Sequence, residues 1–274
     1  MKYFDIHSHL HSDFFKGNIE KVLEEMKKKE IGTISVGVNL IDSKKAVDLA
    51  NKNKNIWATI GIHPTEKEKF EEEKFQKLVN QNKNKIIGIG ECGLDYYWLQ
   101  KDLEGGKIKI ESLTLEKERQ KELFKKQIDF AIKNNLPLML HVRPYKNADA
   151  YWDVFEILDK KREGFSSLLK VNFHFFTEKP EIAQEILKRG YYISLPGVIT
   201  FADLDKTIEN IPLEKIMPET DSPFAAPIPH RGKINTPLFV PEIFKKIAKI
   251  KNISEEKCHK QLSINIGKFW NIKF

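Results

Sequence analysis

The sequence predicts one (β/α)8 barrel, an α/β fold of the TIM type, over residues 1–274. Short apolar or β-branched runs alternate with longer amphipathic stretches from one end of the chain to the other, and about eight such units can be counted. Eight units in a chain of 274 residues match the size of one barrel. No Pro-, Gly- or Ser-rich linker divides the chain, so a single domain is the economical reading.

The predicted strands are the short runs, at 3–9, 33–38, 56–63, 86–91, 137–142, 171–175, 191–195 and 216–221. Predicted helices between them include 18–30, 42–53, 115–135 and 179–190, the last ending at Gly190, a typical helix C-cap. Two further helices are expected after Pro241 and from Ser254. Periodicity alone does not separate a closed barrel from an open doubly wound sheet, so the positions of the polar residues must decide.

One segment does not follow the repeat. The stretch "YYWLQKDLEGGKIKIESL" is too long for an ordinary strand-to-helix loop, and Gly105-Gly106 separates two short runs in it. The second run alternates Lys-Ile-Lys-Ile, which is typical of a strand. We therefore predict a small hairpin flap, inserted at 98–113.

The bulk composition is that of an ordinary globular protein. Lys and Arg number 46 against 39 Asp and Glu, for a net charge of +7, which favours a polyanionic partner over a polycationic one. The lysines lie mostly on predicted helix faces, so charge alone does not establish nucleic-acid binding. Two cysteines make no disulfide framework. No apolar run approaches the roughly 18 residues of a membrane span, so we expect a cytoplasmic protein with no membrane association and no obligate protein partner.

The first predicted strand, "YFDIHSHLHSD", ends in histidines spaced by one residue. A period of two places Asp5, His7 and His9 on one face of the strand. The two histidines lie about 7 Å apart along the strand at its ~3.3 Å rise per residue, so both can tilt onto a common ion. This pair alone is weak evidence for a metal site.

Other polar side chains also fall at the ends of predicted strands. They are His63 in "ATIGIHP", Glu91 in "KIIGIGECG", His141 in "PLMLHVRP", His174 in "VNFHFF" and Asp221 in "KIMPETDSP". Active sites of βα barrels lie at the carboxyl ends of the strands, so these residues should converge with His7 and His9 on one mouth. Imidazole nitrogens and carboxylates gathered in one pocket are typical ligands of divalent metals. Without His63 these are six ligands, which suit two ions better than one hydrolytic zinc ion with an open position.

With these residues in place, the chain resembles the TatD family of metal-dependent hydrolases and nucleases, which are amidohydrolase-like βα barrels. The resemblance runs along nearly the whole chain through "FDIHSHLH", "GIHPTE", "IIGIGECGLDYY", "LPLMLHVR", "NFHFFT", "YYISLPGVITF", "PETDSPFAAPIPHRGKINTP" and "NIGKFW". It implies metal-dependent cleavage of phosphodiester bonds in DNA, often from an end. The cofactors it implies are two divalent ions, Mg²⁺, Mn²⁺ or Zn²⁺.

The resemblance also implies roles for individual residues. One ion would be bound by His7, His9 and Asp221, the other by His141 and His174, with Glu91 as the bridge. His63 would position the substrate or transfer a proton, and Glu219 would orient ligands or the leaving group from behind them. Glu91, Asp221, His63 and Glu219 would thus be the catalytic residues. "HFFT", "HVRPY" and the 98–113 segment depart from the family pattern without removing a ligand.

Two arginines and a group of aromatic residues are candidates for substrate contacts. Arg143 lies two residues beyond His141, on the same side of the strand, and suits a forked phosphate contact. Arg231 follows the last predicted strand and suits a second phosphate, whereas a loop salt bridge is the alternative for both arginines. Directly after "GECGLD", Tyr96 and its neighbours Tyr97 and Trp98 could stack an unpaired base or simply pack their loop.

Two enzyme classes and one binding function remain open on these residues. The leading hypothesis is a deoxyribonuclease. The second is a metal-dependent deacylase or amidohydrolase acting on a carbonyl such as an aminoacyl ester. Barrels of that kind often carry a carboxylated Lys at the fourth strand, where this chain has Glu91. A binding protein that has lost activity is disfavoured because the ligand set is complete.

Overall fold

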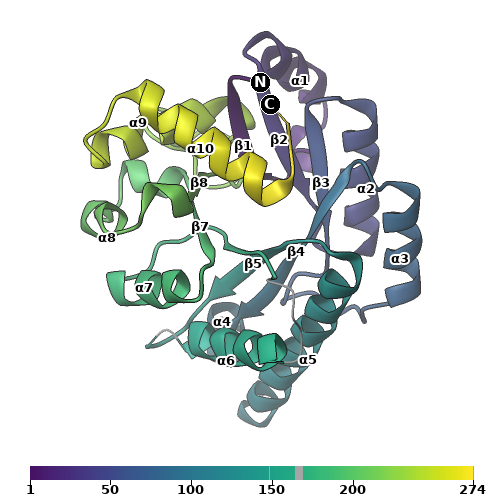
Figure 1. The fold of residues 1–274 in the computed structure, drawn as a ribbon. Coiled ribbons are helices and arrows are strands. Elements are labelled where there is room, and N and C mark those ends of the chain that lie inside the picture. Colours follow the sequence, from purple (N-terminus) through teal and green to yellow (C-terminus); the bar gives the residue numbers. More distant parts are fainter. Residues whose placement is uncertain (148, 164–168, 274) are drawn as a thin grey trace.

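The computed structural model describes residues 1–147, 149–163 and 169–273. Eight parallel strands pair in chain order around the molecule (Figure 1). They are β1 (Tyr3–Ser8), β2 (Ile31–Val36), β3 (Ile56–Ile60), β4 (Ile86–Asp95), β5 (Leu138–Arg143), β6 (Val171–Phe173), β7 (Tyr192–Leu195) and β8 (Ile216–Pro218). A bridge between Ser8 and Ser222, with the His9 N–H donating to the Ser222 carbonyl at 2.7 Å, brings the end of β1 to the segment after β8. The barrel prediction and all eight strands are confirmed, with ends that differ by a few residues.

Helices cover the outside of this barrel (Figure 1). They are α1 (Ile19–Lys28), α2 (Leu40–Lys52), α3 (Glu72–Gln81), α4 (Tyr96–Glu104), α5 (Ile110–Asn134), α6 (Asp149–Glu163), α7 (Pro180–Lys188), α8 (Asp205–Glu209), α9 (Val240–Ile250) and α10 (Glu255–Trp270). Local chemistry sets several ends: the Asn39 side chain accepts from the Asp42 N–H at the start of α2, and Ser254 caps α10 in the same way. Gly190, with φ of +79°, follows α7 as predicted.

The last helix closes the amino-terminal end of the barrel. Inward-facing strand residues such as Phe4, Ile34 and Met217 form one buried cluster with Ile266, Phe269 and Trp270 of α10. Gly88 in β4 makes room for this helix, because a Cβ there would lie 2.6 Å from the Trp270 ring. The opposite end, where the strands finish, is therefore the end left for a site.

The predicted hairpin flap at 98–113 is wrong. Most of that segment is helical, because α4 covers Tyr96–Glu104 and α5 begins at Ile110. The Asp95 side chain accepts from the Trp98 N–H at 2.9 Å and starts α4, while Tyr96 and Leu99 anchor the helix by burial. Gly106, with φ of +71°, lies in the turn after α4 and does not serve as a hairpin turn.

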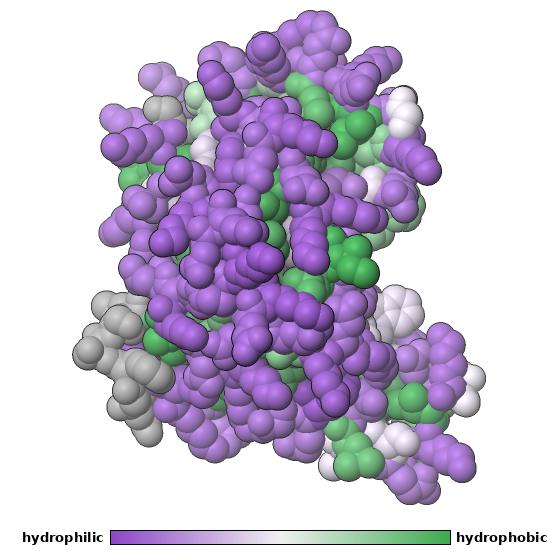
Figure 2. Space-filling view, turned by 90° about the vertical axis from the view of Figure 1, so that its right-hand side faces the viewer, coloured by the Kyte–Doolittle hydropathy of each residue, from purple (hydrophilic) through white to green (hydrophobic). Residues whose placement is uncertain are grey.

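The surface shown in Figure 2 is largely hydrophilic, and the two cysteines form no disulfide. On the side of α2 and α3, hydrophilic residues predominate and hydrophobic ones show only between them (Figure 2). Among the described helices, none has the length and apolar character needed to cross a membrane. Both Cys92 and Cys258 are buried free thiols, and burial raises the pKa of Cys258 to about 11.

Gln127 of α5 is expected to be important for stability. Its buried amide accepts from the Ile62 N–H at 2.7 Å and donates to the Ile62 carbonyl at 2.9 Å, just before His63. Gln127→Ala leaves both backbone groups buried without a partner, so the free energy of unfolding in urea should fall by roughly 1–3 kcal/mol. The exposed Gln81→Ala is the control; an equal effect of both changes would contradict this role of the amide.

Candidate metal centre

The six residues predicted as ligands come together at the carboxyl ends of the strands. His7, Glu91 and His141 lie within β1, β4 and β5. The other three follow their strands: His9 comes one residue after β1, His174 one after β6 and Asp221 three after β8. The donors therefore form a ring, because the carboxyl ends of all the parallel strands lie at the same end of the barrel.

The first donor set consists of His7, His9, Asp221 and one oxygen of Glu91. The two histidine Nε2 atoms are 3.2 Å apart. Each lies 3.5–3.6 Å from Glu91 Oε2 and from Asp221 Oδ1. The His9 ring is fixed by a 2.9 Å hydrogen bond between Nδ1 and the Val36 carbonyl, which leaves Nε2 to face the cluster.

The second donor set faces the other oxygen of Glu91. His141 Nδ1 and His174 Nε2 each lie 2.8 Å from Glu91 Oε1, and these two nitrogens are 3.5 Å apart. The Glu91 carboxylate thus lies between two histidine pairs, one pair to each oxygen. Groups of donors that lie within 4.8 Å of one another include His7 with His9 and Glu91, His63 with Glu91 and His141, and His7 with His174 and Glu219.

Glu91 carries its charge in a buried place. Only 4 % of its surface is exposed, and burial alone would raise its pKa. The positive charge of His174 and hydrogen bonds from His141 outweigh burial and hold the pKa of Glu91 well below its usual range. The carboxylate is therefore ionised at neutral pH and available to a cation.

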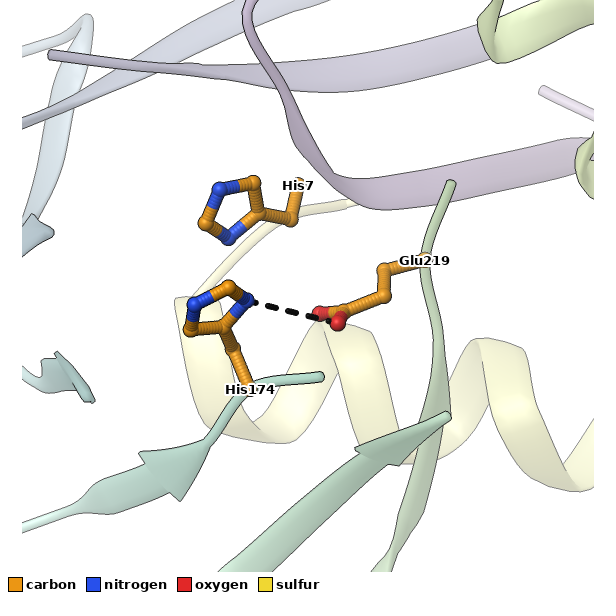
Figure 3. A group of neighbouring side chains, drawn as sticks. All are labelled: His7, His174 and Glu219. Carbon is orange, nitrogen blue, oxygen red and sulfur yellow. Dashed lines mark ion pairs between the residues drawn. The ribbon is translucent and has the colours of Figure 1, made fainter. Parts of the chain in front are cut away.

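Glu219 lies behind His174, away from Glu91. The rings of His7 and His174 stack with centroids 4.1 Å apart, and Glu219 Oε1 lies 3.4 Å from His174 Nδ1 (Figure 3). The Glu219 carboxylate also accepts from the Phe175 N–H and, at 2.6 Å, from the Ser194 hydroxyl. Glu219 thus touches a candidate ligand through that ligand's far nitrogen, where it can orient the ring.

Asp95 does the same for His141, and the sequence prediction missed it. Its Oδ2 lies 2.9 Å from His141 Nε2, which leaves Nδ1 facing Glu91. The signal was visible in "ECGLD", because Asp95 follows Glu91 by four residues on the same strand face. A carboxylate behind a histidine fixes the tautomer and raises the ligand's basicity.

His11 is a second residue that the prediction left out. Its Nε2 lies 2.9 Å from Asp42 Oδ2 and its Nδ1 2.7 Å from the Ser35 hydroxyl. Both ring nitrogens are occupied, so His11 is fixed in the wall of the cleft. Its alternation with His7 and His9 in the sequence was the available signal.

His63 lies at the edge of the second donor set. Its Nε2 is 3.7 Å from Glu91 Oε1, and its ring centroid is 4.3 Å from that of His141. His63 Nδ1 lies 2.7 Å from the Thr65 hydroxyl oxygen and 3.3 Å from the Thr65 N, which leaves Nε2 to face Glu91. Burial, and then the charge of His141, lower the pKa of His63 to about 3, so the ring is neutral at physiological pH.

Five of the six donors, all except the fully buried His7, line a cleft of about 740 Å³. Arg143 is in its wall, with the guanidinium 4.1 Å from the Tyr97 ring centroid and 5.5 Å from that of Trp98. Within the described parts of the chain, no acidic group pairs with Arg143. Its charge is thus held over two aromatic rings, at the place predicted for a phosphate contact.

The structure does not bring Tyr96 or Arg231 into the cleft. Tyr96 is 1 % exposed and donates its hydroxyl to Asp153 at 2.6 Å, so its ring packs α4 and has no free face for a base. Arg231 donates to the Ala226 carbonyl at 3.2 Å and covers the Phe201 ring. The substrate contact expected of Tyr96 is therefore corrected, because its buried ring packs its own segment, whereas the phosphate contact of the exposed Arg231 stays a prediction.

Comparison with known proteins shows the family to which this chain belongs. The family model described as "TatD related DNase" matches residues 4–271. The chain belongs to the TatD family. A metal-dependent hydrolase of Bacillus subtilis is 32% identical over 93% of both chains, and one of Mycoplasma genitalium is 33% identical over 99% of this chain and 100% of its own. This TatD-family chain is thus a metal-dependent hydrolase.

Solved structures agree on the fold. The Escherichia coli TatD homologue YjjV covers 99% of both chains with a TM-score of 0.83 at 21% identity. A TatD family hydrolase of Entamoeba histolytica covers 98% of both chains with a TM-score of 0.79 at 23% identity. The coverage shows that the likeness extends over the whole barrel, and at these identities it concerns the fold alone.

The role of Asp95 can be measured through metal affinity. Asp95→Asn keeps the size of the side chain but weakens the hold on His141 Nε2, so Zn²⁺ or Mn²⁺ affinity by calorimetry should fall roughly 10- to 100-fold. The exposed Asp48→Asn is the control. Unchanged affinity in Asp95→Asn would show that Asp95 serves only the start of α4.

Proposed function

We propose that this chain is a deoxyribonuclease that hydrolyses phosphodiester bonds of DNA with two divalent ions, Mg²⁺, Mn²⁺ or Zn²⁺. The observation that carries the proposal is the buried Glu91 carboxylate between two sets of imidazole nitrogens. His7, His9 and Asp221 would hold one ion, and His141 and His174 the other. Glu91 would bridge the two ions.

The distances within the first donor set fit a bound cation, whereas in the second set both histidine nitrogens lie 2.8 Å from Glu91 Oε1, at direct hydrogen-bond distance. Ligand atoms around a tetrahedral ion at about 2.1 Å lie about 3.4 Å apart. Five separations within the first donor set fall between 3.2 and 3.6 Å. Two imidazole nitrogens at 3.2 Å repel each other unless a proton or a cation lies between them, and the two carboxylates of this set favour a cation.

When bound, a pair of divalent ions lowers the pKa of a water molecule and polarises the phosphoryl oxygens of a substrate. The protein's part is to position the groups around them. Arg143 can pair with a phosphate oxygen because its guanidinium is uncompensated and faces the cleft. His63, which is neutral and has Nε2 facing the donor set, can hydrogen-bond to the substrate or to the leaving oxygen.

Three observations favour a phosphodiester over a carbonyl substrate. The family model that matches the chain is described as "TatD related DNase". The net charge is +7, which attracts polyanions. The Glu91 carboxylate lies between the two donor sets, and Arg143 lines the cleft. Among the residues described, Arg143 is the only arginine in that lining, and no acidic group pairs with it.

The test is hydrolysis of end-labelled single-stranded DNA by chelator-stripped protein after addition of Mg²⁺, Mn²⁺ or Zn²⁺. Cleavage should require metal and should fall at least about 100-fold in Glu91→Gln, which removes the shared charge while keeping the side chain's shape. Thermal stability should stay nearly the same, since the site lies at the barrel mouth.

The exposed Glu256→Gln is the matched control and should cleave like the wild type. No cleavage with any of the three metals would overturn the nuclease proposal, and aminoacyl esters would then be the next substrates. Equal cleavage by wild type and Glu91→Gln would overturn the role of Glu91.

A further inference from the structure

Two phenylalanines stand exposed beside the first donor set. Phe14 belongs to the turn η1 (Asp13–Phe15) and Phe224 comes three residues after Asp221; they are 60% and 50% exposed. Their ring centroids are 6.1 Å apart at an interplanar angle of 73°. Both line the cleft that holds the metal donors. Apolar side chains exposed together at a polar cleft are typical of a binding surface.

The pair lies directly against the metal centre. The Phe224 ring centroid is 6.2 Å from that of His9, whose Nε2 belongs to the first donor set. A group stacked on Phe224 would therefore lie next to a phosphate held at the donors. Trp98, 48% exposed, lines the same cleft and lies under Arg143.

The cleft thus has three chemical parts. Its floor carries the carboxylates and imidazoles, Arg143 contributes a cation, and Phe14 and Phe224 contribute aromatic faces. Aromatic rings stack unpaired bases whatever the base, and a guanidinium pairs with phosphate oxygens. A nucleotide has a planar base joined through its sugar to a phosphate. The base can stack on the aromatic rings while the phosphate lies at the donors and Arg143.

We propose that Phe14 and Phe224 form a stacking subsite for an unpaired nucleobase next to the phosphate bound at the metal centre. The proposal rests on the proposed nuclease function and adds the residues that recognise the base. A base in a duplex has its faces covered by its neighbours, so the subsite selects single-stranded or frayed DNA. It does not read the sequence, because no polar side chain is needed for stacking.

The test compares a fluorescein-labelled oligothymidylate with an abasic oligonucleotide of the same length and backbone. Binding is followed by fluorescence anisotropy with Mn²⁺ and phosphorothioate-linked oligonucleotides, which resist hydrolysis, and cleavage is followed separately with phosphodiester-linked ones. The wild type should bind the base-bearing oligonucleotide roughly 10- to 100-fold more tightly. Phe14→Ala/Phe224→Ala should lose this preference while binding the abasic oligonucleotide as the wild type does.

Two further variants separate stacking from folding. Phe14→Tyr/Phe224→Tyr should restore the preference, because tyrosine also stacks. Phe201→Ala should retain it, because Phe201 is 42% exposed but does not line the cleft. Melting temperatures of all variants show whether the barrel remains folded.

The outcomes distinguish the two proposals. Equal wild-type affinity for the two oligonucleotides, or an equal loss on both in Phe14→Ala/Phe224→Ala, overturns the stacking subsite. A base preference that disappears only in that variant supports the subsite even if no metal gives cleavage. In that last case the hydrolytic proposal alone falls.

Discussion

The structure of the site depends on one buried charge, the carboxylate of Glu91. A carboxylate that is 4% exposed is costly unless it is paired. Here each oxygen faces two histidine nitrogens, from His7 and His9 on one side and from His141 and His174 on the other. These four side chains come from three other strands, so the charge is compensated only when the barrel is closed.

The two ends of the barrel have different roles: one holds a packed apolar cluster and the other holds the candidate metal donors. At the amino-terminal end, apolar strand residues and α10 form a closed cluster around Trp270. At the carboxyl end, packing continues only as far as the donors, and the cleft opens beyond them. Gly93 shows how tight the boundary is, because a Cβ there would lie 2.0 Å from the His141 carbonyl oxygen. The strands β4 and β5 are thus held close together where Glu91 and His141 must meet.

Groups behind the donors connect the site to the surrounding helices. Asp95 holds His141 with one oxygen and starts α4 with the other, so the helix in place of the expected hairpin is built onto the site. Gln120 of α5 accepts from the Asp95 N–H at 2.8 Å and donates to its carbonyl at 3.1 Å. A shift of α4 or α5 is therefore transmitted to His141 through the hydrogen bonds of Gln120 and Asp95.

The sequence by itself determined the barrel and the residues of its mouth. Repeated units of a parallel sheet bring all strand ends to one edge, so polar residues there had to meet whatever the loops did. Tertiary structure decided what spacing cannot express: that Tyr96 is buried while its neighbour Trp98 is exposed, and which nitrogen of His141 faces Glu91. Rotation of a side chain and the approach of segments far apart in the chain depend on packing. Phe14 and Phe224, some 210 residues apart, could be paired only by the closed barrel.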